Sequence, residues 1–121
     1  MERYVDGFLL PIAKDKVSKY KEIAQKASQI WKDLGALEYY ECIGDDLDIE
    51  EMVSFKKAAN ASEEETVIFS WIVYESKEER DRVNEKVMND PRMKEMMESG
   101  ESDLFDYRRM AYGGFKTLVN L

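Results

Sequence analysis

Carboxylates set among apolar residues are the side chains of this sequence best placed to carry chemistry. Asp6 lies within the run YVDGFLLPI, and Glu38 and Tyr40 alternate along ALEYYECIG. The chain contains no histidine, the usual general base near neutral pH and the commonest metal ligand. Histidine-based triads and zinc sites are therefore excluded, and any catalysis would depend on carboxylate, tyrosine or arginine groups. No glycine-rich phosphate loop is present, and we expect neither a metal nor a cofactor.

Two interpretations of Asp6 are open. A carboxylate among strand residues is costly to bury unless it is paired. A structural ion pair would come from Arg108 or Arg109 on the last predicted strand. Alternatively, burial raises the pKa of Asp6 and prepares it to act as a general base.

Aromatic and polar side chains at regular spacing suggest where a ligand would bind. Glu38 and Tyr40 share a strand face, which is either an ordinary mixed contact face or the polar wall of a pocket. Trp31 and Trp71 either belong to the core or face each other across a cleft between the first helix and the central strand. The candidate pocket residues are Asp6, Trp31, Glu38, Tyr40, Trp71 and Arg109.

Apolar residues at spacings of three and four predict a helix over 15–34, with Asp15 as its N-cap and Gly35 as its C-terminal stop. Ser76 and Glu79 form a predicted capping box at the start of a second helix, which Pro91 interrupts. Four methionines surround this break and are expected to pack inward or to form a flexible lid; they are Met88, Met93, Met96 and Met97.

Runs of β-branched and aromatic residues predict the strands of one sheet. The run 66–74, TVIFSWIVY, is nearly continuous in apolar residues, as expected for a central strand buried on both faces. Gly113 and Gly114 interrupt the last run and suggest a bulge or a tight bend. The other strands are expected at 4–12, 36–44 and 108–119, with a short edge strand at 53–60 and an acidic surface loop at 45–51.

This order of elements predicts one α+β domain over residues 1–121. We expect a ferredoxin-like β-α-β-β-α-β sandwich, an antiparallel sheet with helices on one face. The other face would expose one apolar side of the central strand, either that of Phe69 and Trp71 or that of Ile68 and Ile72. Exposed patches of this kind mark interaction sites, so we predict a homodimer in which two sheets cover each other. The alternative is a monomer in which residues 45–60 fold over the open face.

Charge and composition exclude several classes of partner. The formal net charge is −8, and no run of five consecutive lysines or arginines occurs, which argues against nucleic-acid binding. No apolar run approaches the roughly 20 residues that a membrane helix needs. One cysteine, Cys42, rules out an intrachain disulfide, and the absence of a signal peptide predicts a cytoplasmic protein.

Several long motifs together identify a family resemblance. VDGF, WKDLGALEYYEC, FSWIVY, KVMNDPRM and GGF resemble the YbaA-like family of small bacterial proteins, catalogued as domain of unknown function 1428. The resemblance covers nearly the whole chain. It implies the fold of the dimeric α+β barrel superfamily, whose members bind hydrophobic or aromatic ligands between helices and sheet. It implies no reaction.

The sequence therefore favours a homodimeric protein that binds or senses a small hydrophobic or aromatic ligand. The first alternative is a cofactor-independent enzyme, such as a monooxygenase or isomerase, that uses a carboxylate, tyrosine or arginine site. The second alternative, an RNA-associated protein, is disfavoured by the acidic charge.

Overall fold

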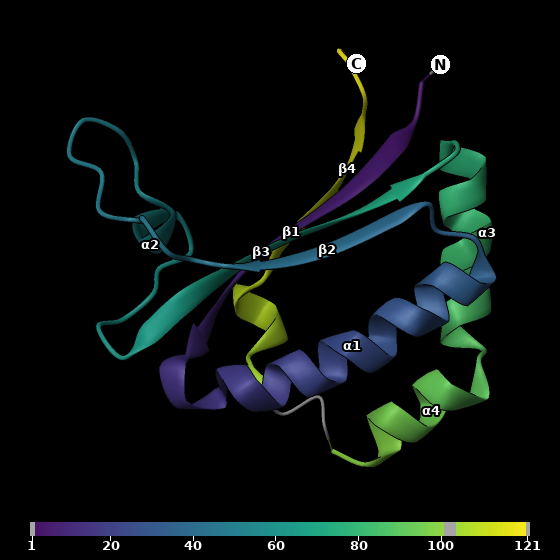
Figure 1. The fold of residues 1–121 in the computed structure, drawn as a ribbon, viewed down its shortest axis with the longest axis horizontal. Helices are drawn as coiled ribbons and strands as arrows, with labels where there is room; N and C mark the ends of the chain where they lie inside the picture. Colours follow the sequence, from purple (N-terminus) through teal and green to yellow (C-terminus); the bar gives the residue numbers. More distant parts are fainter. Residues whose placement is uncertain (1, 101–103, 121) are drawn as a thin grey trace.

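A four-stranded antiparallel sheet forms the centre of the fold in the computed structural model, which describes residues 2–100 and 104–120. The strands lie in the order β2-β3-β1-β4. Their bounds are β1 (Tyr4–Ala13), β2 (Glu38–Ile43), β3 (Glu65–Tyr74) and β4 (Ala111–Lys116). The helices α1 (Val17–Leu34), α3 (Lys77–Met88) and α4 (Pro91–Glu98) lie on one side of this sheet (Figure 1). The chain thus has an α+β fold, as predicted.

Helix α1 matches the predicted apolar stripe, but its start differs. A 3₁₀ turn at Lys14–Lys16 precedes the helix, and its N-cap, Lys16, makes no side-chain capping bond. The prediction of Asp15 as the cap was therefore wrong, because Asp15 lies within the 3₁₀ turn. Gly35 ends the helix at φ 125°, a conformation that L side chains rarely adopt.

The core fills the space between the sheet and the helices in two clusters. Ile30 of α1 and Val83 and Val87 of α3 pack against β3 residues Ile72 and Tyr74. The second cluster joins α1 to the other end of β1 and β3; it contains Leu10, Ile12, Tyr20, Ala24 and Ile68. Because alternate residues of a strand point to opposite faces, the even-numbered residues of β1 and β3 are the ones that meet the helices.

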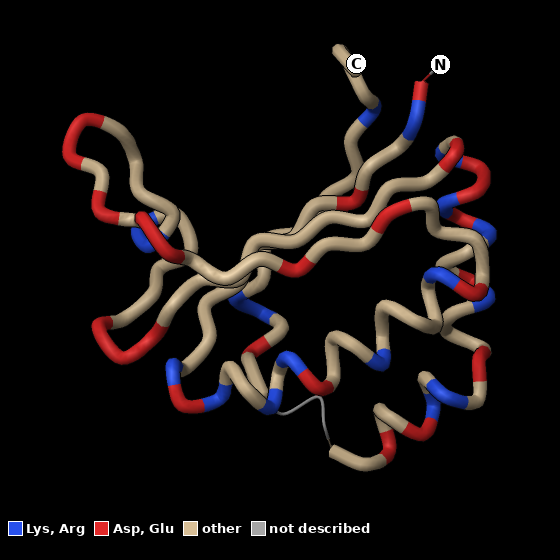
Figure 2. The backbone as a smooth tube through the Cα atoms, in the orientation of Figure 1, with Lys and Arg blue, Asp and Glu red and all other residues tan. Residues whose placement is uncertain are grey.

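The segment predicted as an edge strand at 53–60 is instead helical. Helix α2 (Phe55–Ala58) is capped by Ser54, whose hydroxyl accepts a bond from the Lys57 amide at 3.1 Å. The ring of Phe55 packs on Phe69 with centroids 5.6 Å apart, so this turn is held at the sheet by an aromatic contact. The prediction failed because a local cap and one long-range contact outweigh weak strand propensity. The neighbouring loop, including the predicted acidic segment 45–51, extends from the end of the sheet (Figure 2).

Strand β4 is shorter than predicted and contains no bulge. Residues Tyr107–Arg109 form a 3₁₀ turn, which Asp106 caps, and the strand begins at Ala111. Its register with β1 is uninterrupted and pairs Gly7 with Gly113 and Asp6 with Gly114. Glycine is needed at 114 for a different reason: a Cβ there would lie 2.8 Å from Cε2 of Tyr4.

Helices α3 and α4 meet at the predicted break. Ser76 caps α3 by accepting a bond from the Glu79 amide, but the Glu79 carboxylate binds Arg82 at 2.6 Å. The expected capping box is therefore only half formed. Pro91 starts α4, and Met93 and Met96 pack toward the core. Met88 and Met97 are instead mostly exposed, so the predicted inward packing holds for Met93 and Met96 only. Within the described residues, no helix combines the length and apolar content needed to cross a bilayer.

Candidate functional site

The helix-facing side of the sheet carries its polar residues in rows that run across the strands. Glu41 of β2 pairs with Ser70 of β3, and Ser70 pairs with Phe8 of β1. In the next row, Ile72 lies between Tyr39 and Asp6. The first row forms part of the floor of a cavity, and the second row leads from this cavity to a buried ion pair.

A cavity of about 230 Å³ lies between this floor, α1, α4 and residues 105–110. Ala24 and Ala27 on α1 leave room above the sheet, since longer side chains at these positions would occupy the space. Most of the lining is aromatic or apolar, and it includes Phe8, Trp31, Met93, Met96, Phe105 and Met110. Its shape therefore suits a small apolar group.

Two larger hollows border this cavity. One of about 410 Å³ lies between α1 and α4 and is lined largely by polar and charged side chains, such as Gln29 and Arg92. The other, of about 400 Å³, lies between α1 and β2 and shares Tyr20, Tyr39 and Glu41 with the 230 Å³ cavity. The Glu41 carboxylate therefore lies where the 400 Å³ hollow meets the 230 Å³ cavity.

Glu41 accepts hydrogen bonds from two tyrosines. The Tyr20 hydroxyl of α1 donates to Oε1 and the Tyr39 hydroxyl of β2 donates to Oε2, each at 2.7 Å. Burial, followed by the nearby charge of Glu41, raises the pKa of both tyrosines. Both hydroxyls therefore keep their protons and remain donors at any physiological pH.

Asp6 lies beside the cavity in a separate ion pair. Its residue surface is 1% exposed, and its Oδ1 is 3.7 Å from Nε of Arg80 on α3. Neither of these two atoms has a hydrogen-bond partner within the described part of the chain. Burial raises the pKa of Asp6, and the Arg80 charge opposes this shift. Asp6 does not line the 230 Å³ cavity.

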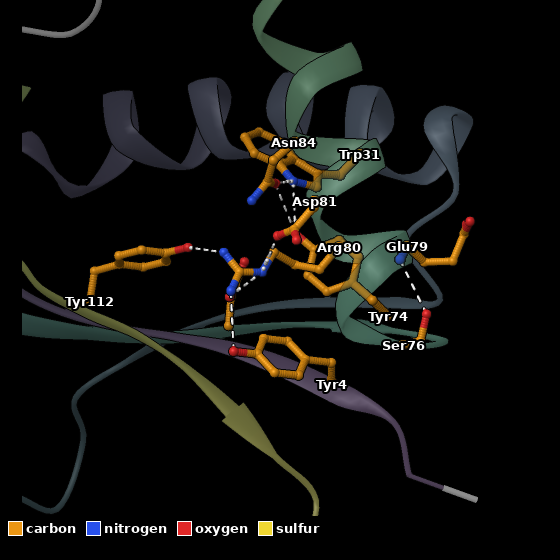
Figure 3. A network of polar contacts seen from close by, with 10 residues as sticks. Tyr4, Trp31, Tyr74, Ser76, Glu79, Arg80, Asp81, Asn84 and Tyr112 are labelled. Carbon is orange, nitrogen blue, oxygen red and sulfur yellow. Dashed lines mark hydrogen bonds and ion pairs between the residues drawn. The ribbon is translucent and has the colours of Figure 1, made fainter.

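Tyrosines hold the Arg80 guanidinium above the sheet (Figure 3). Arg80 donates to the hydroxyl of Tyr4 at 3.1 Å and to that of Tyr112 at 3.3 Å. It also lies 4.9 Å from the centroid of the Tyr4 ring, a distance at which cation–π attraction acts. The ion pair thus attaches α3 to β1 and β4.

Trp31 makes polar contacts beside the cavity. Its indole N–H points to the Tyr74 hydroxyl at 3.1 Å and to Oδ1 of Asn84 at 3.3 Å, and Tyr74 also donates to Asn84 (Figure 3). The same tryptophan lines the cavity. One side chain therefore joins α1, β3 and α3 through polar contacts while it presents an apolar surface to the cavity.

The structure divides the predicted pocket residues between two faces of the sheet. Asp6 and Trp31 lie on the helix side, whereas Tyr40 stacks on Trp71 on the opposite side, with centroids 4.9 Å apart. The alternative in which Trp31 and Trp71 face each other is wrong, because residue 71 points away from the side shared by Ser70 and Ile72. Glu38 belongs to the same opposite face and lies 3.7 Å from Arg3.

The predicted ion pair of Asp6 with Arg108 or Arg109 does not form. Arg109 forms two bonds of 2.9 Å with Glu65, and Arg108 pairs with Asp106. Both arginines lie in the 3₁₀ turn before β4, so they never reach the strand position opposite Asp6.

Glu41, Tyr20 and Arg80 were not predicted as site residues. Residues two apart on a strand share a face, as Tyr39 and Glu41 do, and Tyr20 is spaced four residues from Ala24 on α1. These signals were compatible with a site, but no local pattern distinguished Arg80 from the other charged residues of α3.

Comparison with known proteins places the chain in a family. Residues 3–107 match the family described as "Protein of unknown function (DUF1428)". The chain is 47% identical to the proteins called "Uncharacterized protein YbaA" from Escherichia coli (strain K12) and Shigella flexneri, over 98% of each chain. A de novo designed protein, Foldit4, aligns at a TM-score of 0.44 and 11% identity over 99% of this chain and 100% of its own, a likeness too distant to bear on the fold. The match to the family and the identity to YbaA show that this chain belongs to the DUF1428 family.

Proposed function

We propose that this protein is a homodimer that binds a small apolar or aromatic ligand in the cavity between α1 and the sheet. The observation that carries this proposal is the cavity of about 230 Å³ itself, with an aromatic lining and a few polar groups at one side. Binding sites for small molecules commonly combine these two features. The volume is below the roughly 300–1,000 Å³ typical of sites for drug-sized ligands, so the ligand is small.

The other face of the sheet supports the proposed dimer. Tyr40, Phe69 and Phe115 are 50%, 44% and 60% exposed on this face. The Phe115 ring lies over Gly7 and Gly113, with its Cε1 3.4 and 3.7 Å from where their Cβ atoms would be. The strand order β2-β3-β1-β4 is compatible with a ferredoxin-like sandwich whose open face pairs with that of a second copy, as in a dimeric α+β barrel.

A carboxylate-based enzyme is the second candidate. The buried Asp6, with a raised pKa and an unbonded Oδ1, has the properties of a general base. A substrate in the 230 Å³ cavity would not meet Asp6 directly, however, because Asp6 is not part of its lining. Ligand binding therefore has the stronger geometric support. RNA binding has less support, since the net charge of −8 would repel a phosphate backbone.

The binding proposal is tested by filling the cavity. Naphthalene serves as a neutral probe, and its binding is measured by ligand-observed NMR with the wild-type protein, the Ala27→Phe variant and the Ala58→Phe variant. Ala27 lines the cavity, whereas Ala58 lies exposed on α2. We expect binding to wild type and to the Ala58 variant, and its loss in the Ala27 variant. Equal binding by all three folded proteins would place the probe elsewhere and refute the cavity as the site.

A further inference from the structure

The proposed cavity combines apolar walls with a single charge. Among the described residues that line it, Glu41 is the one carboxylate, and no lysine or arginine is present. Lys21 borders the outer hollow between α1 and β2 but not the cavity itself. A ligand inside the cavity therefore meets a negative group and no positive side chain from this lining.

We propose that the cavity selects a small primary amine with an aromatic or apolar body, bound as its ammonium ion with Glu41 as the counter-ion. This inference rests on the proposed binding function and adds the chemical class of the ligand. It follows from the unused hydrogen-bond acceptors around Glu41 and from the aromatic and apolar side chains that line the rest of the cavity.

The polar side of the cavity is rich in acceptors. Tyr20 and Tyr39 each commit their one hydroxyl proton to Glu41, so their oxygens can offer only lone pairs to a ligand. Each carboxylate oxygen accepts one of these bonds and retains further acceptor capacity. An ammonium group has three donors and no acceptor. It can therefore donate to the lone pairs that remain free on the oxygens of Glu41, Tyr20 and Tyr39.

Ser70 supplies an independent observation. It is 5% exposed, lines the cavity and pairs directly with Glu41 across the β2–β3 ladder. In the described part of the chain its hydroxyl has no hydrogen-bond partner. Because Ser70 lines the cavity, a ligand N–H donor next to Glu41 would give this hydroxyl a partner.

The walls suit the body of such a ligand. Trp31, Phe8 and Phe105 present aromatic surface, and Met93 and Met96 on α4 add polarizable side chains that adapt to an irregular shape. Aromatic rings also attract a cation by their quadrupole. An anionic ligand would instead place its charge near Glu41 in a partly desolvated site, where like charges repel strongly.

Three probes of nearly equal shape test this inference in wild-type protein: 2-phenylethylamine, 2-phenylethanol and 3-phenylpropionate. Their dissociation constants are measured by NMR titration at pH 7. We expect the amine to bind at least about tenfold more tightly than the alcohol, as a charge-assisted hydrogen bond provides, and we expect no saturable binding of the carboxylate. Equal affinity for amine and alcohol, or preference for the carboxylate, would overturn the inference.

Glu41→Gln tests the role of the charge, because glutamine keeps the size of the side chain. We expect this variant to lose the preference for the amine while it binds the alcohol within about threefold of wild type. Glu38→Gln on the opposite sheet face is the matched control and retains the preference. Circular dichroism verifies folding, and Ser70→Ala is a second variant expected to weaken amine binding. An unchanged amine preference in folded Glu41→Gln would contradict the inference.

The outcomes separate this inference from the proposed function. If naphthalene and the alcohol bind and the cavity-filling Ala27→Phe variant abolishes their binding, the binding function holds whatever the result for the amine. If neither the neutral probes nor the amine bind, both proposals are wrong.

Discussion

The Tyr20 hydroxyl of α1 lies 2.7 Å from Oε1 of Glu41 on β2 and donates a hydrogen bond to it. This contact spans the interface between the first helix and an edge strand, 21 residues apart in the sequence. Tyr39 binds the other oxygen of the same carboxylate. Glu41 is thereby held in a fixed orientation at the side of the cavity.

Removal of either tyrosine hydroxyl should destabilise the helix–strand interface. We expect Tyr20→Phe and Tyr39→Phe each to lower the free energy of unfolding by about 1–2 kcal/mol, because the lost bond has a charged acceptor. Urea denaturation measures the change. Tyr107→Phe is the control and should alter stability by less than about 0.5 kcal/mol, since Tyr107 is exposed and its hydroxyl makes no bond among the described residues. A similar loss in all three variants would refute the role of Glu41 as acceptor.

Loss of Arg80 should leave Asp6 as an uncompensated buried charge. We expect Arg80→Met to lower the free energy of unfolding by about 3 kcal/mol at pH 7, as is typical when one partner of a buried pair is removed. Arg108→Met removes an arginine with a 91% exposed side chain and should have little effect. Addition of Asp6→Asn to Arg80→Met should restore part of the loss, as measured by chemical denaturation. If Asp6→Asn restores no stability to Arg80→Met, the loss of stability in Arg80→Met does not come from the Asp6 charge.

The raised pKa of Asp6 predicts how its contribution to stability depends on pH. Between its ordinary value of 3.8 and its higher value in the fold, the folded state binds more protons than the unfolded state, so stability from this group falls as pH rises. Wild type should therefore gain stability relative to Asp6→Asn as pH decreases from 7 toward 4. Denaturation at several pH values measures this difference. A wild-type advantage that instead increases with pH would show that the pKa is lowered.

Alanine at the two adjacent glycines of β4 should have unequal effects. A Cβ at position 114 would overlap the Tyr4 ring, whereas at position 113 the nearest atom is 3.7 Å away, in the exposed Phe115 ring. We expect Gly114→Ala to cost about 1–3 kcal/mol of stability because Tyr4 must move, and Gly113→Ala to cost less than about 1 kcal/mol. Thermal unfolding compares the two variants. An equal loss of stability in the two variants would mean that the Tyr4 ring moves aside without strain.

The open sheet face predicts the oligomeric state. Sedimentation equilibrium at micromolar concentration should give twice the chain mass of 14.2 kDa. Tyr40→Asp adds a charge to this face and should yield folded monomer, while Met88→Asp on the exposed side of α3 should remain dimeric. A monomeric wild type would refute the dimer. A dimeric Tyr40 variant would place the interface elsewhere.

The sequence by itself determined the first helix, the central strand and the family. The apolar spacing along 17–34, the stop at Gly35 and the β-branched run of β3 each depend on neighbours within a few residues, and periodicity records such local preferences directly. The alternation along β2 also showed that Tyr39 and Glu41 share a face. Long shared motifs further indicated the family to which the chain belongs.

Only the tertiary structure decided which strand faces meet the helices and which distant charges pair. Alternation assigns Ser70 and Trp71 to opposite faces, but the side on which α1 and α3 pack determines which of them lines the cavity. Arg80 reaches Asp6 because α3 crosses the end of β1, while the turn before β4 directs Arg109 to Glu65. These contacts join residues more than 40 positions apart, and their energies depend on packing and burial that no local pattern contains.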